Sequence, residues 1–244
     1  MKVSVVVPAF NEEKYIAKCI ESLLAQIEPA DEIIIVDNNS TDTTKAIANS
    51  YPVTVLTEKK QGTIAARDKG FNAAQYEIIA RTDADTIVPP TWIKQIKASF
   101  TNSPIIALSG PCVYHPNKRA EDVTKLPSQL FSTTYKYMLG HDCIYGFNMA
   151  MRKETWHLVR KQTCRDSELV HEDFDLSIHL SSFGKIKCDN KMIVYTSPRR
   201  WKKTRPYFEY PYRYIKMMKQ HQIVVFETTT DQIVKRLPLR ELFK

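Results

Sequence analysis

The sequence predicts an α/β fold, doubly wound around a mostly parallel sheet, with helices on both faces and a mixed C-terminal lobe. Unbroken β-branched runs at 3–8 and 32–37 are typical of strands buried on both faces of a sheet. Between such runs lie apolar residues at helical spacing, for example Tyr15, Ile16, Cys19, Ile20, Leu23 and Leu24. Strands that alternate with helices favour right-handed βαβ units and hence a parallel sheet.

The first part of the chain carries this alternation as far as residue 110. Strands are predicted at 3–8, 32–37, 53–56, 76–82 and 105–110, and helices at 11–26, 63–74 and 91–100. A short helix is predicted to end at residue 48, because Ser40, Thr41 and Asp42 are good N-cap residues. Beyond residue 110 we expect a helix around 120–139, a strand near 147–151, a helix that opens at Glu172 and short strands near Ile186 and Ile193.

Composition and charge limit the class of protein. Hydrophobic residues make up 43% and charged residues 25% of the 244 residues, which argues against a disordered chain. The net charge of +8 favours anionic partners. The five cysteines are widely spaced and form no C-x-x-C, so they indicate neither a disulfide framework nor a zinc site. Without a signal peptide or an apolar stretch of roughly 20 residues, the chain is expected to be cytoplasmic.

Polar side chains follow three of the predicted strands. The first strand ends in residues 8–12, the second in residues 37–39 and the fourth in residues 83–85. In an open α/β sheet, ligands bind outside the carboxyl ends of the strands. Because parallel strands end at one edge, we expect these three stretches to converge on a ligand site.

Asp83 and Asp85 form a D-x-D pair directly after a buried strand. On extended backbone the two side chains would point the same way, and paired carboxylates repel unless a cation lies between them. Mg²⁺ or Mn²⁺ prefers such oxygen ligands and is commonly shared with substrate phosphates. The alternative is that one Asp caps a turn and the other is solvated. The chain has no glycine-rich phosphate loop, so bound phosphates would need a metal and Lys or Arg.

An ordered set of motifs resembles the family 2 glycosyltransferases of GT-A fold: VSVVVPAFNEEKYIAKCIESL, EIIIVDNNSTDTT, QGTIAARDKGF, RTDADT and HEDFDLS. The resemblance covers at least residues 3–183. It implies an inverting enzyme that uses a nucleotide-diphosphate sugar and Mg²⁺ or Mn²⁺. By resemblance, the donor-binding residues are Pro8, Phe10, Glu12, Asp37, Arg67 and Asp83, and the metal ligands are Asp83 and Asp85. The family usually has Asn where this chain has Asp68.

The transfer also needs a group that accepts the proton of the attacking hydroxyl. By resemblance to the Glu-Asp motif of the family, Asp173 is the general base and Glu172 assists it. Both acids also suit the first turn of a helix, where the dipole favours negative charge. His171 is either a third metal ligand or an ordinary surface or core histidine. Gly146 and Asn148 are further candidates for contacts with the acceptor, although a plain buried strand explains their neighbours equally well.

The segment 197–219 mixes cations with aromatic rings. Three interpretations stand: a packed helix with solvated charges, a surface that docks on anionic lipid, and a single-stranded nucleic-acid site. Nucleic acid is the least favoured of these partners. The cations of segment 197–219 are densest at Arg199, Arg200, Lys202, Lys203 and Arg205. Arg200 and Trp201 resemble the end of a Q-x-x-R-W motif, but Ser197 replaces the Gln, so a processive enzyme is not indicated and the pair stays a candidate acceptor contact.

The sequence therefore predicts one domain, 1–244. Residues 1–110 bind the nucleotide-sugar, residues 111–196 form the acceptor and catalytic half, and residues 197–244 form a basic aromatic extension. The expected acceptor is a saccharide or a lipid-linked molecule of cell-envelope polysaccharide assembly, with peripheral contact at an anionic membrane. The alternatives are transfer to a polyprenyl phosphate and a non-catalytic nucleotide- or RNA-binding protein on the same fold.

Overall fold

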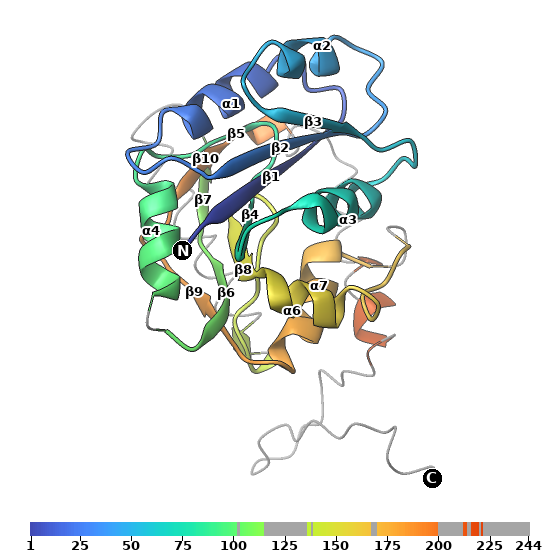
Figure 1. Cartoon of the computed structure of the whole chain (residues 1–244). Coiled ribbons are helices and arrows are strands. Elements are labelled where there is room, and N and C mark those ends of the chain that lie inside the picture. The colour runs from blue at the N-terminus through green and yellow to red at the C-terminus, as the bar shows by residue number, and fades with distance from the viewer. Residues whose placement is uncertain are drawn as a thin grey trace, which may run out of the picture.

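The computed structural model describes residues 1–101, 103–114, 136–137, 139–166, 170–199, 212–213, 216–219 and 221. Within this part of the chain, a main sheet of seven strands lies next to a small sheet of three (Figure 1). In spatial order, the main sheet contains β3 (Thr54–Thr57), β2 (Glu32–Asp37), β1 (Val3–Ala9), β4 (Ile78–Arg81), β8 (Met149–Arg152), β6 (Ile105–Ser109) and β9 (Lys185–Cys188). The small sheet contains β5 (Thr86–Ile87), β10 (Val194–Thr196) and β7 (Cys112–Tyr114).

Most strands of the main sheet are parallel. The ladders β3–β2, β2–β1, β1–β4 and β6–β9 are parallel, whereas β8 runs antiparallel between β4 and β6. Every residue of β1 except Pro8 is buried, as expected for an unbroken apolar strand in the middle of a sheet. The predicted α/β class with a mostly parallel sheet is therefore confirmed.

Helices cover both faces of the main sheet (Figure 1). Val5 and Val7 of β1 pack into one hydrophobic cluster with α1 (Ile16–Leu24) and α4 (Trp92–Phe100), and the short α2 (Thr44–Asn49) adds Ala48 to it. Val6 points the other way, into a second cluster with α3 (Thr63–Ala73), α6 (Lys153–Val159) and α7 (Glu172–Ser181). The alternation of side chains along one strand therefore supplies both cores.

Several predicted elements have the expected bounds. The second strand covers 32–37 as predicted, and α7 begins at Glu172. The sequence analysis missed β5, β7 and α6, which have two, three and seven residues. Elements this short contain too few residues for a periodic pattern to stand out. The helix expected around 120–139 lies outside the described residues except for helical positions at 136–137 and 139.

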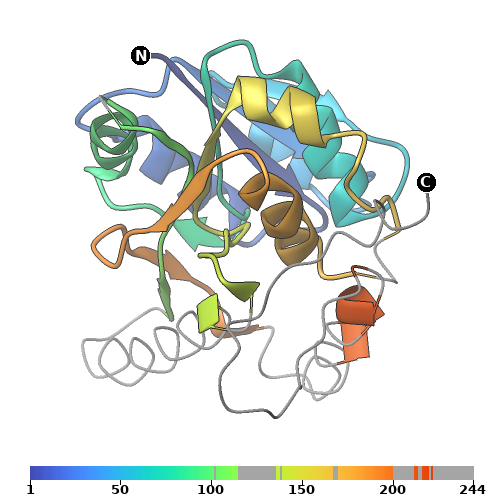
Figure 2. The same cartoon turned by 90° about the horizontal axis from the view of Figure 1, so that it is seen from below.

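The described C-terminal residues lie on the α7 side of the molecule, where Figure 2 shows them in orange-red. Met217 and Met218 are buried in a third cluster with Phe174 of α7. None of the described helices is both long and apolar enough to cross a membrane. Arg200, Trp201, Lys202, Lys203 and Arg205 lie outside the described residues, so the anionic-membrane contact of this segment stays a prediction.

Candidate active site at the carboxyl ends of the strands

The carboxyl ends of β1, β2 and β4 meet at one edge of the main sheet. Ala9 is in register with Asp37, and the Asn38 N–H donates to the Ala9 carbonyl at 2.8 Å. The Thr82 N–H donates to the carbonyl of Val6 at 3.3 Å. The three polar stretches that follow these strands therefore begin side by side, as the parallel topology predicts.

The turns after β1 and β2 have a tightly bonded backbone. Asn11 and Asn39 both have positive φ values, 53° and 61°, which Asn tolerates better than most residues. The Thr41 N–H donates to Asn11 Oδ1 at 2.8 Å, which ties the two turns together. Beside them, Phe10 is 45% exposed, whereas Asp37 is buried with Oδ1 lacking a hydrogen-bond partner in the described part of the chain. An exposed ring next to an unsatisfied carboxylate oxygen fits a ligand with a flat apolar part and hydroxyl donors.

The D-x-D stretch is a tight turn. The Thr86 N–H donates to the Asp83 carbonyl at 3.0 Å, so the backbone between the two acids is not extended. The expectation that strand-like alternation aligns their side chains is therefore wrong. The turn nevertheless leaves both acids near Glu12. Each of the two carboxylates lies close enough to raise the pKa of Glu12.

Arg199 lies between Glu12 and Asp85. Its Nε donates to Asp85 Oδ2 at 3.1 Å, its Nη2 donates to Glu12 Oε1, and its guanidinium lies 4.7 Å from the centre of the Tyr15 ring. The sequence analysis had placed Arg199 in the basic cluster of the tail, whereas the structure places it among the site carboxylates. Burial raises the pKa of Glu12, although its bond to Arg199 acts in the opposite direction.

Arg81, the last residue of β4, connects the D-x-D turn to the start of α7. Its side chain is buried, and its two Nη atoms reach three carboxylates: Asp83 at 3.4 Å, Glu172 at 2.5 Å and Asp173 at 3.4 Å. The motif resemblance assigns no role to Arg81. The available signal was a cation at the end of an apolar strand, directly before two acids that need neutralisation.

Glu172 and Asp173 begin α7 and differ in their partners. Glu172 accepts from Arg81 and, at 2.8 Å, from Arg67. Although burial by itself raises the pKa of Glu172, these two guanidinium groups hold it at about 2. Burial, together with the neighbouring Glu172 charge, raises the pKa of Asp173 to about 8. The two neighbouring acids are therefore shifted in opposite directions, with the charged form favoured at Glu172 and the protonated form favoured at Asp173.

Arg67 has no exposed surface in this structure. Besides Glu172, its guanidinium bonds Asp68 Oδ1 at 2.7 Å and lies 5.6 Å from the Trp156 ring. The Asp that stands in place of the usual Asn therefore pairs with the neighbouring arginine. In this arrangement the buried Arg67 holds the Glu172 carboxylate through its Oε2 atom.

The two further acceptor candidates are placed differently from each other. The Gly146 N–H donates to Asp173 Oδ2 at 2.9 Å, and a Cβ at this position would lie 2.6 Å from Arg81 Cζ and 2.8 Å from Asp173 Oδ1. A side chain at this position would therefore have to displace the ends of Arg81 and Asp173. The Asn148 amide is fully buried and bonds Trp92 Nε1 at 2.8 Å and the carbonyls of Pro111 and Met192, which joins the two sheets.

The donor set suits a divalent cation. Among the described residues, six carboxylates of the site are paired with only three guanidinium groups, and Glu12 Oε2 is buried without a hydrogen-bond partner. An excess of carboxylate oxygens is what Mg²⁺ and Mn²⁺ prefer. Asp83, Asp85 and Glu12 are the residues that would hold such an ion.

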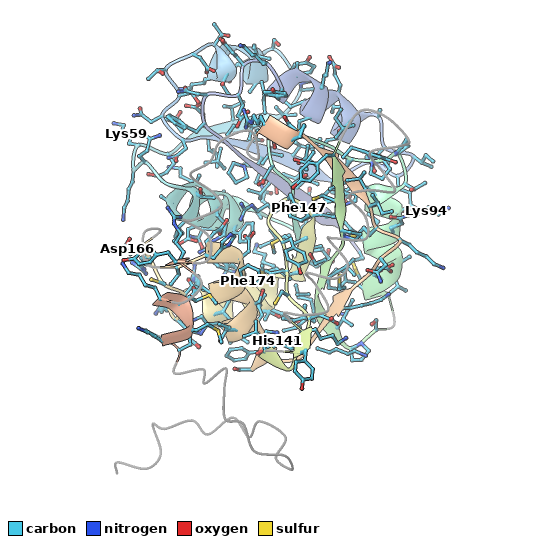
Figure 3. The ribbon with its side chains drawn as sticks, turned by 180° about the vertical axis from the view of Figure 1, so that it is seen from behind. Lys59, Lys94, His141, Phe147, Asp166 and Phe174 are labelled. Carbon is cyan, nitrogen blue, oxygen red and sulfur yellow. The ribbon has the colours of Figure 1, made fainter. Side chains whose placement is uncertain are left out.

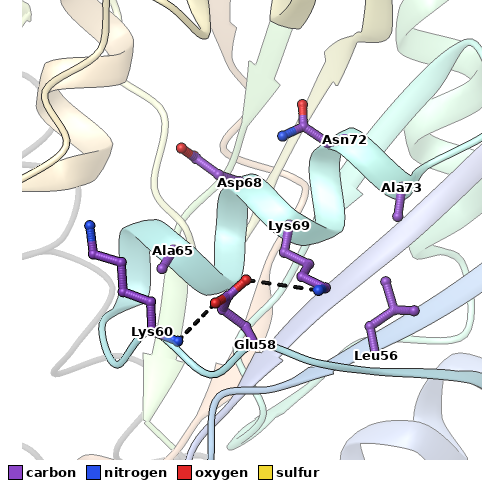
Figure 4. Close-up of a pocket in the computed structure, with 8 residues that line it drawn as sticks. All are labelled: Leu56, Glu58, Lys60, Ala65, Asp68, Lys69, Asn72 and Ala73. Atoms are coloured by element: carbon purple, nitrogen blue, oxygen red, sulfur yellow. Dashed lines mark hydrogen bonds and ion pairs between the residues drawn. The ribbon is translucent and has the colours of Figure 1, made fainter.

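Figures 3 and 4 place further residues of the molecule. In Figure 3, Phe147 lies toward the middle of the molecule and Phe174 below it, whereas Lys59, Lys94 and Asp166 lie at the periphery. Figure 4 shows a hollow over α3 and the segment after β3, and none of Glu12, Asp37, Asp83 and Asp85 lines it. Its lining residues are Leu56, Glu58, Lys60, Ala65, Asp68, Lys69, Asn72 and Ala73.

Comparison with known proteins identifies the family to which this chain belongs. Residues 4–159, more than half of the chain, match the family model described as Glycosyl transferase family 2. The chain belongs to glycosyl transferase family 2. The resemblance inferred from the sequence motifs is therefore confirmed.

Curated glycosyltransferases match parts of the chain. The chondroitin synthase of Escherichia coli is 28% identical over 199 residues, which cover 78% of this chain and 28% of that enzyme. Glycosyltransferase AglE of Haloferax volcanii is 28% identical over 124 residues, which cover 47% of this chain and 41% of AglE. The chain thus spans less than half the length of either relative.

Solved glycosyltransferase structures share the fold. The mannosyltransferase PcManGT of Pyrobaculum calidifontis, in complex with GDP-Man and Mn²⁺, has a TM-score of 0.61 at 21% identity, over 80% of this chain and 56% of that one. TarS 1–349 of S. aureus, in complex with UDP-GlcNAc, has a TM-score of 0.60 at 22% identity, over 81% of this chain and 58% of that one. This family 2 chain therefore has the GT-A fold.

Proposed function

We propose that this family 2 chain is an inverting glycosyltransferase that moves a sugar from a nucleotide-diphosphate sugar to an acceptor hydroxyl, with Asp173 as the general base. One observation carries the proposal. Arg81 contacts Asp83 on one side and Asp173 on the other, each at 3.4 Å. The group that suits a metal–diphosphate and the group that suits proton abstraction therefore lie on either side of one guanidinium.

The donor side consists of the three strand ends. Phe10 offers an exposed face to a nucleobase beside the half-buried Pro8, and the unsatisfied Oδ1 of Asp37 is available to hydroxyl donors. Glu12, Asp83 and Asp85 would hold Mg²⁺ or Mn²⁺, which when bound neutralises charge on the leaving diphosphate. The related fold of PcManGT holds GDP-Man with Mn²⁺, which supports the same class of donor here.

The acceptor side consists of Asp173 and the groups that orient it. The acceptor oxygen bonds to the anomeric carbon while the bond from that carbon to the diphosphate breaks, and the hydroxyl proton passes to Asp173. The Gly146 N–H fixes Asp173 Oδ2, and Arg81 lies at Oδ1. A base works best when its pKa lies near the working pH, and a pKa of about 8 meets this condition.

The acceptor is proposed to be a saccharide or a lipid-linked hydroxyl compound. Transfer to a polyprenyl phosphate is the second candidate within the family, and that acceptor needs little base catalysis. The raised pKa of Asp173 favours the hydroxyl acceptor, because a phosphate oxygen already lacks its proton at neutral pH. Family membership favours an enzyme over a non-catalytic nucleotide- or RNA-binding protein.

A panel of nucleotide-diphosphate sugars, each with and without Mn²⁺, tests the proposal. We expect one donor to release its nucleoside diphosphate only when metal and acceptor are present, and the product to have the inverted anomeric configuration by NMR. A product with retained configuration would overturn the single-displacement mechanism. Full turnover after chelation would overturn the metal assignment.

A further inference from the structure

A second group of metal-ligand side chains lies on α7, away from the strand-end carboxylates. Asp175 and His179 lie one turn apart on this helix, and His221 comes from the C-terminal segment that packs beside it. One ligand atom from each of the three residues lies within 4.8 Å of the other two. Residues two positions apart on a helix face in nearly opposite directions, so Asp175 does not share the face of Asp173.

Two imidazole rings converge on one buried oxygen of Asp175. Its Oδ1 lies 2.9 Å from Nε2 of His221 and 3.7 Å from Nε2 of His179, while its Oδ2 accepts the Cys164 N–H at 2.9 Å. Asp175 is 1% exposed, and a buried carboxylate needs a compensating positive charge. The ion-pair partners recorded for Asp175 among the described residues are these two histidines. A metal ion bound by both rings and by Asp175 would supply such a charge.

We propose that Asp175, His179 and His221 bind one Zn²⁺ ion that fastens the C-terminal segment to α7. Tetrahedral zinc with bonds of about 2.0–2.1 Å separates neighbouring donor atoms by roughly 3.3 Å, and the distances of 2.9 and 3.7 Å lie on either side of that value. The two rings are inclined at 70°, so their nitrogens approach a common point from different directions. Imidazole favours zinc, whereas the carboxylates at the strand ends favour Mg²⁺ or Mn²⁺, so the two sites take different ions.

The surroundings suit an ion that cross-links two packed elements. Met217 and Met218 precede His221 and are buried against Phe174 and Ile178 of α7. Two ligands from the helix and one from the C-terminal segment would cross-link these packed elements and leave a fourth position for water. The first turn of α7 also carries Glu172 and Asp173, so the ion would stabilise the helix that presents the general base.

Zinc binding to the full chain tests this site directly. The protein is stripped with chelator, supplied with excess Mg²⁺ to fill the strand-end site, and titrated with Zn²⁺ against a chromophoric chelator in the absence of nucleotide. We expect one Zn²⁺ per chain and at least a tenfold loss of affinity in His221→Gln and in His179→Gln, because even residues outside the ligand set are worth about 10- to 100-fold. Gln retains a donor to Asp175, which protects the fold of the metal-free variants.

His157→Gln is the matched control, since His157 is an exposed histidine of α6 outside the cluster. It should bind zinc like the unaltered chain. Co²⁺ in place of Zn²⁺ should give the visible absorption of a tetrahedral site, and His221→Gln should lose it. Absence of stoichiometric zinc, or equal zinc affinity in His221→Gln and the unaltered chain, would overturn the proposal. Matching circular dichroism of the metal-free proteins excludes misfolding as the cause of a loss.

Discussion

Two groups of carboxylates lie on either side of Arg81, and they are neutralised in different ways. Glu172 and Asp173 have side chains that are 11% and 13% exposed, and buried arginines hold them. Asp85 pairs with Arg199, whose side chain is 37% exposed and comes from a distant part of the chain. Arg199 is the most exposed of the three arginines, so solvent screens its ion pairs the most, and a ligand would replace it more readily than Arg67 or Arg81. The proposed catalytic pair, Glu172 and Asp173, is thus held by arginines of the buried core, whereas the proposed metal ligands Glu12 and Asp85 are held by a more exposed arginine.

The largest effect is expected at the proposed catalytic pair. Asp173→Asn keeps the shape of the side chain but removes the proton acceptor, which typically lowers the rate by about 10²- to 10⁴-fold. Donor affinity, measured by calorimetry, should hardly change. Glu154→Gln is the matched control, because Glu154 is also an acid in the first turn of a helix, on α6. Near-normal turnover of Asp173→Asn would place the base elsewhere or favour a phosphate acceptor.

The pH dependence tests the same pair. A base with a pKa of about 8 is active above that value, so turnover at saturating substrate should rise with pH and level off above pH 8. At two units below the pKa, only about 1% of the base is ionised, so the rate should be about a hundredfold lower.

The linked stability has a defined sign. The folded pKa of Asp173 lies above the ordinary aspartate value of 3.8, so its contribution to stability is complete below pH 4 and is lost as pH rises to about 8. Denaturant unfolding should show this loss in the unaltered chain but not in Asp173→Asn. A flat rate profile between pH 6 and pH 8 would contradict the assignment.

A smaller effect is expected at the proposed metal ligands. Asp85→Asn removes a proposed metal ligand, so donor affinity with Mn²⁺ should fall at least tenfold, by analogy with the 10- to 100-fold cost of disturbing groups around a bound metal. Chelation of the unaltered chain should have the same effect, and added Mn²⁺ should restore affinity only in the unaltered chain. Undiminished donor affinity after chelation would refute the metal-bridged donor site.

The smallest effect is expected at Arg199, where the affinities for Mn²⁺ and for the donor should change in opposite directions. Arg199→Gln removes a cation from Glu12 and Asp85, so Mn²⁺ alone should bind up to about fivefold more tightly, the equivalent of 1 kcal/mol. Donor affinity should fall severalfold, because a cation beside the diphosphate is lost. Lys94→Gln, an exposed charge change on α4, should alter neither value. Weaker Mn²⁺ binding in Arg199→Gln would mean that Arg199 supports the metal site instead of competing for it.

The sequence predicted the part of the candidate site that depends only on the order of the parallel strands. Asp37 and Asp83 follow apolar runs, and parallel pairing brings such strand ends together. The motif resemblance identified Asp173 as a candidate base, and the structure places it beside Arg81. The contacts of Arg81 with Glu172 and of Arg199 with Glu12 could not be predicted, because they join residues about 90 to 190 positions apart in the chain, and no local pattern records such contacts.

The conformation of the D-x-D stretch was missed for a different reason. Residues after a strand can continue extended or turn, and the bond from the Thr86 N–H to the Asp83 carbonyl decides between them. The D-x-D sequence was sufficient to indicate a candidate cation site but not the conformation of its backbone. The exposure of Phe10 and the close approach of Gly146 to Arg81 and Asp173 likewise follow from packing between distant segments.

The position of β8 has a consequence for synthesis of the protein. The ribosome makes β6 before β8, yet β6 joins the main sheet through β8, which lies between it and β4. A nascent chain that has reached only β6 therefore has an open edge on β4, and unpaired edges promote aggregation. Fragments that end near residue 110 should be insoluble, whereas extension past β8 gives both strands their partner. The donor side thus depends on later residues to become a stable unit.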